Sequence, residues 1–161
     1  MTFARSAADL PGEDRIRSMS GREFMDAMLS GDLPAPPIAQ GLNYRLDTVE
    51  DGRVTFTGTP RFAHANPMGG IHGGWYGTLL DSCMACAVMT RVPRGSMYTT
   101  LEYKVNICRA LPADTEVRAV GEVSHSGRTT GIAWGEIRCT KTGTLYATGS
   151  TTCLIIALPP G

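Results

Sequence analysis

The sequence predicts an α+β fold in which a curved antiparallel sheet wraps around one long central helix. Residues 71–89 are apolar almost all the way round, as expected for a helix that is buried on every side. Four runs typical of β-strands follow, separated by short turn-forming segments, at 97–108, 115–125, 129–139 and 144–156. One helix cannot cover both faces of such a sheet, but it fills the concave side if the sheet curls around it.

The residues before the central helix predict a short helix and a hairpin. Ser20, with Glu23 three residues later, is a pattern that caps a helix N-terminus. Asp51-Gly52 is a turn signal for a β-hairpin. These signals predict a helix over 20–31 and a pair of strands at 40–49 and 53–59.

The chain divides into an N-terminal arm, residues 1–39, and one domain, residues 40–161. Residues 1–19 are polar and irregular, so we expect them to form a loose arm. The proline-rich residues 32–40 predict a stiff connector that could cover the mouth of a ligand pocket. Within the domain, we expect the four strands after the central helix to pair as a meander.

Composition narrows the function classes. Of the 161 residues 42% are hydrophobic, and the formal net charge is zero, so no nucleic-acid partner is expected. No apolar run reaches the length of a membrane span, and the N-terminus lacks the apolar core of a signal peptide, so no membrane association is expected. Five cysteines, with only Cys83 and Cys86 as a C-x-x-C inside the helix, suit reduced thiols and a cytoplasmic location. The cysteines and histidines lack metal-ligand spacing, so no metal site is expected.

Asp81 is the only acidic residue from Gly52 to Leu101, and it falls inside the apolar helix. A lone carboxylate in an apolar environment is costly unless it is paired or hydrogen-bonded, and Asp81 lies too deep to cap the helix. One interpretation is structural: the carboxylate bonds a nearby hydroxyl such as Thr78 or Ser82, or is exposed on one face. The other is functional: Asp81 is a general base or nucleophile whose pKa is set by partial burial.

The start of the helix favours the functional interpretation. The segment "NPMGGIHGG", residues 66–74, contains four glycines, which are poor helix formers but allow close approach by a ligand. A helix N-terminus offers free N–H groups to a carbonyl oxygen that gains negative charge. Gly73 and Asp81 are eight residues apart, about 12 Å along a helix, so one carbonyl cannot touch both in the same chain. If they share a site, two copies must lie antiparallel in a two-fold dimer.

The motif N-P-x-G-x-x-H-G-G-x-x-x-x-L-x-D, with the later "TTLEYKVNICRAL", "GEVSHSGRTT" and "GTLYATGSTTCLI", resembles the hotdog-fold acyl-CoA thioesterases of the phenylacetate-degradation (PaaI) type. The 4-hydroxybenzoyl-CoA thioesterases with a helix-borne carboxylate are similar. The resemblance covers residues 40–156 and implies a sheet wrapped around a helix, paired into a homodimer and often into a dimer of dimers. It implies an acyl-CoA substrate, with coenzyme A as part of that substrate and no bound cofactor.

The resemblance also implies site residues. Asp81 corresponds to the catalytic carboxylate, which either activates water or attacks the thioester carbonyl, and the N–H of Gly73 corresponds to the group that polarises this carbonyl. His72 and Asn66 correspond to residues that orient the acyl group, and Thr99 to a hydroxyl that positions water. Each of these three also has a structural interpretation, as support for the turn, the loop or the strand.

Coenzyme A contacts are implied for the turn "HSGRTT", which contains His125, Gly127 and Arg128. An arginine fork suits phosphate, although the same side chain can simply be exposed on a hairpin. Gly74 is a further substrate-binding candidate. The other arginine candidates for the nucleotide phosphates are Arg109, with Arg91 and Arg94 as lesser ones.

Two other functions stay open. A hydratase or dehydratase of acyl thioesters on the same fold would pair its carboxylate with a catalytic histidine, but would leave the thioester intact. A non-catalytic acyl-CoA-binding domain would keep the fold without turnover. The sequence leaves open the acyl group, a carrier-protein in place of a CoA thioester, and dimer against tetramer.

Overall fold

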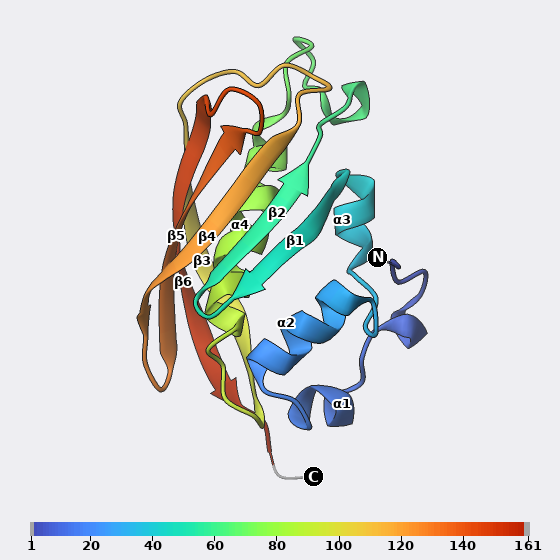
Figure 1. The fold of residues 1–161 in the computed structure, drawn as a ribbon, viewed down its shortest axis with the longest axis vertical. Helices are drawn as coiled ribbons and strands as arrows, with labels where there is room; N and C mark the ends of the chain where they lie inside the picture. Colours follow the sequence, from blue (N-terminus) through green and yellow to red (C-terminus); the bar gives the residue numbers. More distant parts are fainter. Residues whose placement is uncertain (1, 160–161) are drawn as a thin grey trace.

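A computed structural model describes residues 2–159 of the chain, which form a sheet and its helices (Figure 1). In chain order the elements are η1 (Ala7–Asp9), α1 (Glu13–Arg17), α2 (Gly21–Ser30), α3 (Pro37–Gly41), β1 (Tyr44–Glu50), β2 (Arg53–Gly58), η2 (Phe62–His64), α4 (Gly73–Met89), β3 (Ser96–Ile107), β4 (Val117–Ser126), β5 (Thr130–Cys139) and β6 (Leu145–Ala157).

The six strands form one antiparallel sheet in the order β1-β2-β4-β5-β6-β3, and the sheet curls around α4 (Figure 1). Most of α4 is buried, which explains why its sequence is apolar on nearly every side. The α+β class with a curved sheet around a central helix is therefore confirmed. The predicted hairpin is also confirmed, and Gly52 supplies the positive φ, 71°, that its tight turn needs.

The pairing of β3 differs from the predicted four-stranded meander. Strands β4, β5 and β6 pair in sequence order, but β3 lies at the far edge against β6, and β4 pairs with β2 instead. The connection between β3 and β4 crosses the end of the sheet at the start of α4. Buried Leu111 donates its N–H to the hydroxyl of Tyr76 at 2.8 Å, and Asp114 donates its N–H to the carbonyl of Pro60 at 2.8 Å. These contacts hold the connection between β3, at one edge of the sheet, and β4, in its middle.

A row of three glycines lets α4 lie close against the sheet. Gly121, Gly135 and Gly149 are in register across β4, β5 and β6. A Cβ on Gly121 would collide with the backbone of Cys83, and a Cβ on Gly135 would lie 2.8 Å from Cγ of Met84. The glycine row therefore fixes the depth at which the middle of α4 sits, directly after the turn that carries Asp81.

The N-terminal arm is ordered rather than loose. It contains η1 and α1, Phe3 forms a parallel bridge with Ala35, and Ala4 and Ala35 are both buried. The proline-rich connector contains a short helix, α3, because Pro37 takes the first helical position, where a missing N–H costs nothing. The predicted capping box of α2 is confirmed: Ser20 Oγ accepts the N–H of Glu23 at 3.3 Å, and the Glu23 carboxylate accepts the N–H of Ser20.

The arm packs against the domain on the side of α4 that the sheet leaves open. Helix α2 contacts β1 and α4, and α1 contacts β3 (Figure 1). Gly21 donates its N–H to the carbonyl of Val92 at 2.9 Å, and the Glu23 carboxylate pairs with Arg94 at 2.6 Å. These contacts place α2 and α3 over α4 and β1.

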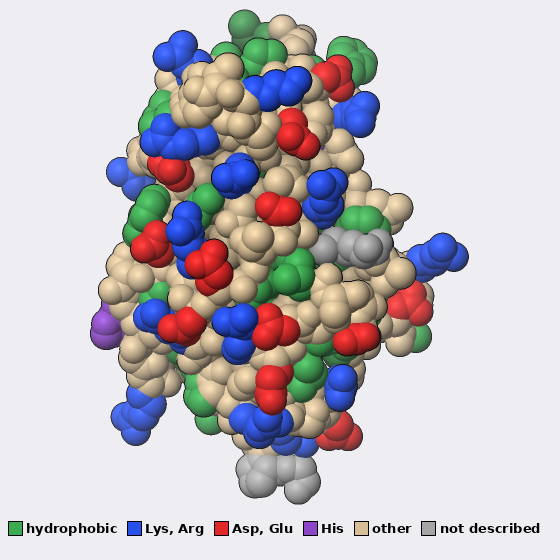
Figure 2. Space-filling view, in the orientation of Figure 1, with side chains coloured by type: hydrophobic (Ala, Val, Ile, Leu, Met, Phe, Trp, Pro, Cys, Tyr) green, Lys and Arg blue, Asp and Glu red, His purple; other side chains and the backbone are tan. Residues whose placement is uncertain are grey.

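The surface carries charges of both signs. Figure 2 shows Lys and Arg side chains interspersed with Asp and Glu over the face that carries β1, β2 and β4. A single-sign field that would attract nucleic acid is not visible on this face. Within residues 2–159, no helix is both long and apolar enough to span a membrane.

Candidate active site

The carboxylate of Asp81 lies half-buried on α4 and faces the edge strand β3. Thr100 Oγ1 donates a hydrogen bond to Asp81 Oδ1 at 3.0 Å. Thr78 and Ser82, the hydroxyls that the sequence suggested as partners of Asp81, bond other groups. Thr78 donates to the carbonyl of Gly74, and Ser82 pairs with the hydroxyl of Tyr44 at 2.9 Å. One oxygen of Asp81 is therefore held in place, and the other remains to accept a proton.

The surroundings of Asp81 favour its protonated form more than water does. Burial raises the pKa of the Asp81 carboxyl above its ordinary value, and the hydrogen bond from Thr100 lowers it in part. The ionisable side chains around it are two tyrosines and three thiols whose pKa values burial also raises, so they are neutral at pH 7: Tyr44, Tyr98, Cys83, Cys86 and Cys153. Among residues 2–159 no cationic side chain offsets this shift, so the carboxylate is a stronger base than an exposed aspartate.

The hydroxyl next to Asp81 belongs to Thr100, one residue after the threonine indicated by the resemblance. Side chains alternate along a strand, so Thr99 and Thr100 point to opposite faces of β3. Thr99 is exposed, whereas Thr100 is half-buried on the concave face. The alternation is interrupted between Thr100 and Glu102, where the register with β6 shifts. The face of β3 on which each threonine lies therefore could not be determined from the sequence by counting residues along the strand.

The N-terminus of α4 is open because its first two residues are glycines. His72 is the N-cap residue, and its Nδ1 accepts the N–H of Gly74 at 2.9 Å. In the neutral ring this leaves the proton on Nε2, which is directed away from the cap. Gly73 is exposed and occupies the first helical position, where its N–H has no acceptor within the helix. His72 therefore has the supporting role in the turn that was one of its two interpretations.

Asn66 organises the loop that leads to α4. Its Oδ1 accepts the N–H groups of Met68 at 2.9 Å and Gly70 at 3.2 Å, and its backbone N–H donates to the carbonyl of Gly70 at 2.7 Å. Gly69, with φ of 84°, makes the turn between them. The carbonyl oxygen of the Asn66 side chain is committed to the loop, so its amide nitrogen is the atom that can contact a ligand.

Within one chain, β3 covers the face of α4 that carries both Gly73 and Asp81. Gly73, Gly77 and Asp81 are spaced four residues apart and so share one face of α4. Tyr103 packs on Gly77, where a Cβ would lie 3.3 Å from its ring, and Ile107 packs near Gly73. Gly73 and Asp81 are about 12 Å apart along the helix axis. One chain does not bring the N–H of Gly73 and the carboxylate of Asp81 to the same carbonyl group.

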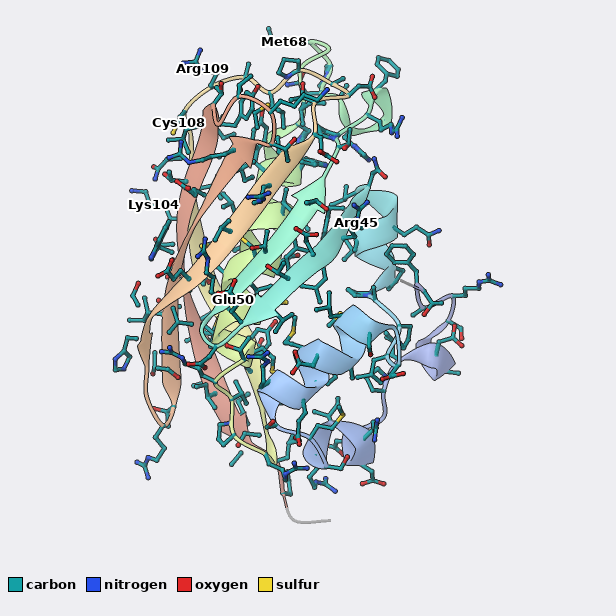
Figure 3. The ribbon with its side chains drawn as sticks, in the orientation of Figure 1. Arg45, Glu50, Met68, Lys104, Cys108 and Arg109 are labelled. Carbon is teal, nitrogen blue, oxygen red and sulfur yellow. The ribbon has the colours of Figure 1, made fainter. Side chains whose placement is uncertain are left out.

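The candidate coenzyme A residues fall into two groups at opposite ends of the sheet. Arg109 lies at the end where α4 begins, near the loop of Met68 (Figure 3). The β4–β5 turn, which holds His125, Gly127 and Arg128, lies near the other end of α4, since Gly131 packs against Val88. Arg128 and Arg109 are both exposed. The two lesser candidates are instead paired with carboxylates, Arg91 with Asp51 at 3.2 Å and Arg94 with Glu23 at 2.6 Å.

The structure adds Thr100 and Tyr44 to the residues predicted around Asp81. The hydroxyl pair between Ser82 and Tyr44 joins α4 to β1, and no motif or spacing in the sequence connects these residues 38 positions apart. The C-x-x-C cysteines are free thiols, and burial raises the pKa of Cys86 to about 12. Within the described part of the chain, no group of three or more His, Cys, Asp or Glu side chains could hold a metal ion.

Comparison with known proteins relates this arrangement to a family. A sequence model of the thioesterase superfamily matches residues 68–146, which include α4, β3 and the following two strands. No protein of curated function matches the chain significantly.

Solved structures match over most of the chain. A thioesterase-like protein from Ralstonia eutropha, described as related to phenylacetic acid degradation, is 27% identical with a TM-score of 0.74, over 81% of this chain and 98% of that one. A mutant form of the phenylacetic acid degradation protein PaaI from Thermus thermophilus is 26% identical, with a TM-score of 0.67 over 73% and 97% of the two chains. A hypothetical thioesterase from Streptococcus pneumoniae, solved with coenzyme A, is 26% identical, with a TM-score of 0.65 over 73% and 89%.

The overall fold and the matched sequence agree with these proteins. The chain thus resembles the thioesterase superfamily over residues 68–146 and PaaI-like proteins over most of its length, and it has the hotdog fold.

Proposed function

We propose that this protein hydrolyses acyl-CoA thioesters to a free acid and coenzyme A. The observation that carries the proposal is the half-buried carboxylate of Asp81, held by Thr100 on a helix whose first residues are glycines. The relative from S. pneumoniae, solved with coenzyme A, supports the substrate class. Coenzyme A is part of the substrate in this proposal, and the reaction needs no bound cofactor or metal. The five free thiols support a cytoplasmic location.

In the proposed reaction Asp81 is the general base. It takes a proton from a water molecule, and the oxygen of that water attacks the thioester carbonyl carbon. The N–H of Gly73 stabilises the negative charge that forms on the carbonyl oxygen. When the carbon–sulfur bond breaks, the sulfur of coenzyme A leaves with the bonding pair and is protonated. The acid product keeps the oxygen from water.

The site is formed by two copies of the chain in this proposal. A two-fold partner with its α4 antiparallel would bring its Gly73 beside Asp81, which the separation within one chain prevents. Strand β3 supports this arrangement, because it is an edge strand of the sheet and leaves Leu101 and Tyr103 exposed by 60% and 46%. Pairing of β3 with β3 of the partner would cover this edge.

The same partner would join the two groups of coenzyme A candidates. Arg109 of one copy and the turn with Arg128 of the other would then lie at the same end of the dimer. Both guanidinium groups are exposed and suit the phosphates of the nucleotide. Further pairing of dimers into a tetramer is compatible with this site and is not required by it.

The test is thiol release from phenylacetyl-, benzoyl-, hexanoyl- and acetyl-CoA by the wild-type protein and by Asp81→Asn. We expect turnover by the wild type and a loss of about 10²- to 10⁴-fold in the variant, the usual contribution of a general base. Asp47→Asn, which changes an exposed carboxylate on β1, is the matched control and should keep full activity.

Three results would contradict the proposal. Full activity of folded Asp81→Asn would remove the carboxylate from the mechanism. Conversion of an unsaturated or hydroxylated acyl-CoA without thiol release would show a hydratase or dehydratase instead, and binding of acyl-CoA without any turnover would show a non-catalytic domain.

A further inference from the structure

A small apolar cavity of about 50 Å³ lies between the N-terminal arm and α4. Its walls come from five elements, because α2 contributes Met28, α3 Ala39, β1 Leu46, β2 Phe56 and α4 Cys86. The arm therefore supplies part of the wall. Residues 28–39 lie outside the segment matched by the thioesterase family model, so the family match does not account for this wall.

The cavity lies next to the turn of α4 that carries the proposed catalytic carboxylate. Ser82, which lines the cavity, follows Asp81 directly in α4. Tyr44, a second lining residue, is close enough to Asp81 for the carboxylate to help raise the pKa of its hydroxyl. An acyl chain whose carbonyl is held at Asp81 would reach the cavity past Ser82 and Tyr44.

The interior of the cavity suits hydrocarbon and not water. The two hydroxyls on its wall bond each other, Tyr44 Oη with Ser82 Oγ at 2.9 Å, so neither needs a water partner. A cavity holds ordered water only when polar groups can bind that water, and dry apolar cavities take apolar ligands. A charged coenzyme A group would also meet no counter-charge here, because no lining residue is ionised.

The size of the cavity limits the occupant. A volume of about 50 Å³ holds roughly four water-sized groups, when each needs about 10–15 Å³. That is the room needed by a short aliphatic tail, and an aromatic ring with its linking carbon exceeds it. Longer chains would have to displace lining side chains such as Met28 and Phe56.

We propose that this cavity binds the acyl tail of the substrate and selects short aliphatic acyl-CoA thioesters, with the N-terminal arm setting the length. The inference rests on the proposed thioesterase function and adds the substrate class. The carbonyl lies at Asp81, and the acyl tail passes Ser82 into the cavity. Ala39 and Met28 form the part of the cavity wall that limits the length of this tail.

The experiment compares kcat/KM for acetyl-, butyryl-, hexanoyl-, octanoyl- and decanoyl-CoA. The wild type is expected to prefer butyryl- or hexanoyl-CoA over decanoyl-CoA by at least about tenfold, since one misfit methylene group is worth about 10- to 200-fold. Ala39→Leu fills the cavity, so it should lower the ratio of hexanoyl-CoA to acetyl-CoA hydrolysis by about tenfold or more. Met28→Ala lengthens the cavity and should move the optimum to octanoyl-CoA or beyond.

Met25→Ala is the matched control. Met25 is buried on the same helix, 1% exposed, but does not line the cavity, so its truncation perturbs α2 without changing the pocket. We expect the chain-length profile of this variant to match the wild type. A profile that Ala39→Leu and Met28→Ala leave unchanged, in active and folded enzyme, would overturn the acyl-pocket assignment while the thioesterase function stands. Absence of thiol release from every substrate would instead overturn the function itself.

Discussion

At the scale of single residues, the proposed chemistry depends on one carboxylate and the hydroxyl beside it. Asp81 could be identified from the sequence because an acidic residue in an apolar helix breaks the local pattern. Thr100 could not, because the choice between adjacent threonines depends on which face of β3 each occupies and on a shift in strand register. Tertiary contacts between distant elements, such as Tyr44 with Ser82, likewise cannot be inferred from a single sequence.

Replacement of Thr100 by valine should change the pH dependence of hydrolysis. The hydrogen bond from Thr100 stabilises the charged form of Asp81, so its removal raises the pKa of the carboxyl further. A general base must be deprotonated, and the acid limb of kcat/KM against pH should therefore move to higher pH in Thr100→Val. Thr99→Val, which changes an exposed side chain, should leave the limb in place. An equal shift in both variants, or none in Thr100→Val, would be inconsistent with the assigned contact.

Asp81 should also cost the protein stability at neutral pH. Its pKa is raised in the folded state above the ordinary value of 3.8, so the folded protein binds the proton more tightly than the unfolded chain. The free energy of unfolding therefore falls as pH rises from 3.8 through the raised value, and the cost is fully present above it. Asp81→Asn should have a higher Tm than the wild type at pH 7, and the difference should shrink towards about pH 3.5.

Thermal unfolding at the two pH values measures this difference, with Asp47→Asn as the control at an exposed carboxylate, where changes stay within about 0.5 kcal/mol. A lower Tm for Asp81→Asn at pH 7 would mean that the charge is stabilised in the fold.

At the scale of elements, α4 and the strands could be located from the sequence, but not all of their partners. Strand periodicity shows where a strand lies and which side chains share a face, and it contains no information about a neighbour about 50 residues away. The connection that sends β3 to the edge depends on the buried Leu111 and its bond to Tyr76. Helix α3 was not predicted from the sequence, because its prolines indicated a stiff connector. In the structure, Pro37 instead starts a helical turn.

Packing of α4 on the sheet depends on the glycine row, and Gly121→Ala tests this directly. The added methyl group would collide with the backbone of Cys83, which cannot turn away as a flexible side chain could. We expect the free energy of unfolding to fall by about 1–3 kcal/mol, as for other overpacked cores. Gly12→Ala is the matched control, because a Cβ there meets nothing within 4 Å. Urea unfolding of both variants measures the difference, and equal stability of Gly121→Ala and wild type would show that α4 does not need the close approach.

At the scale of the whole molecule, the account requires two copies of the chain. The described chain has the proposed catalytic carboxylate, an open helix N-terminus and an exposed edge strand, and it keeps the first two about 12 Å apart along α4. An antiparallel partner would supply the missing half of each site and cover the edge. The spacing of Gly73 and Asp81 led to this expectation from the sequence, because helix rise per residue is fixed by backbone geometry.

A mixed dimer tests the shared site most directly. Gly73→Pro removes only the proposed carbonyl-binding N–H, since proline is well tolerated at the first helical position and His72 already has the extended conformation that precedes it, φ −61° and ψ 138°. Each of Gly73→Pro and Asp81→Asn should be at least about 10²-fold less active when expressed alone. When the two chains are co-expressed, each mixed dimer contains one intact site, made of Gly73 from one chain and Asp81 from the other.

The measurement is thiol release from a short acyl-CoA by the co-expressed pair. Random pairing makes half of the dimers mixed, each with one of two sites intact, so the account predicts recovery to about a quarter of wild-type activity. Activity that stays at the level of the two separate variants would contradict it, and would place the complete site within one chain.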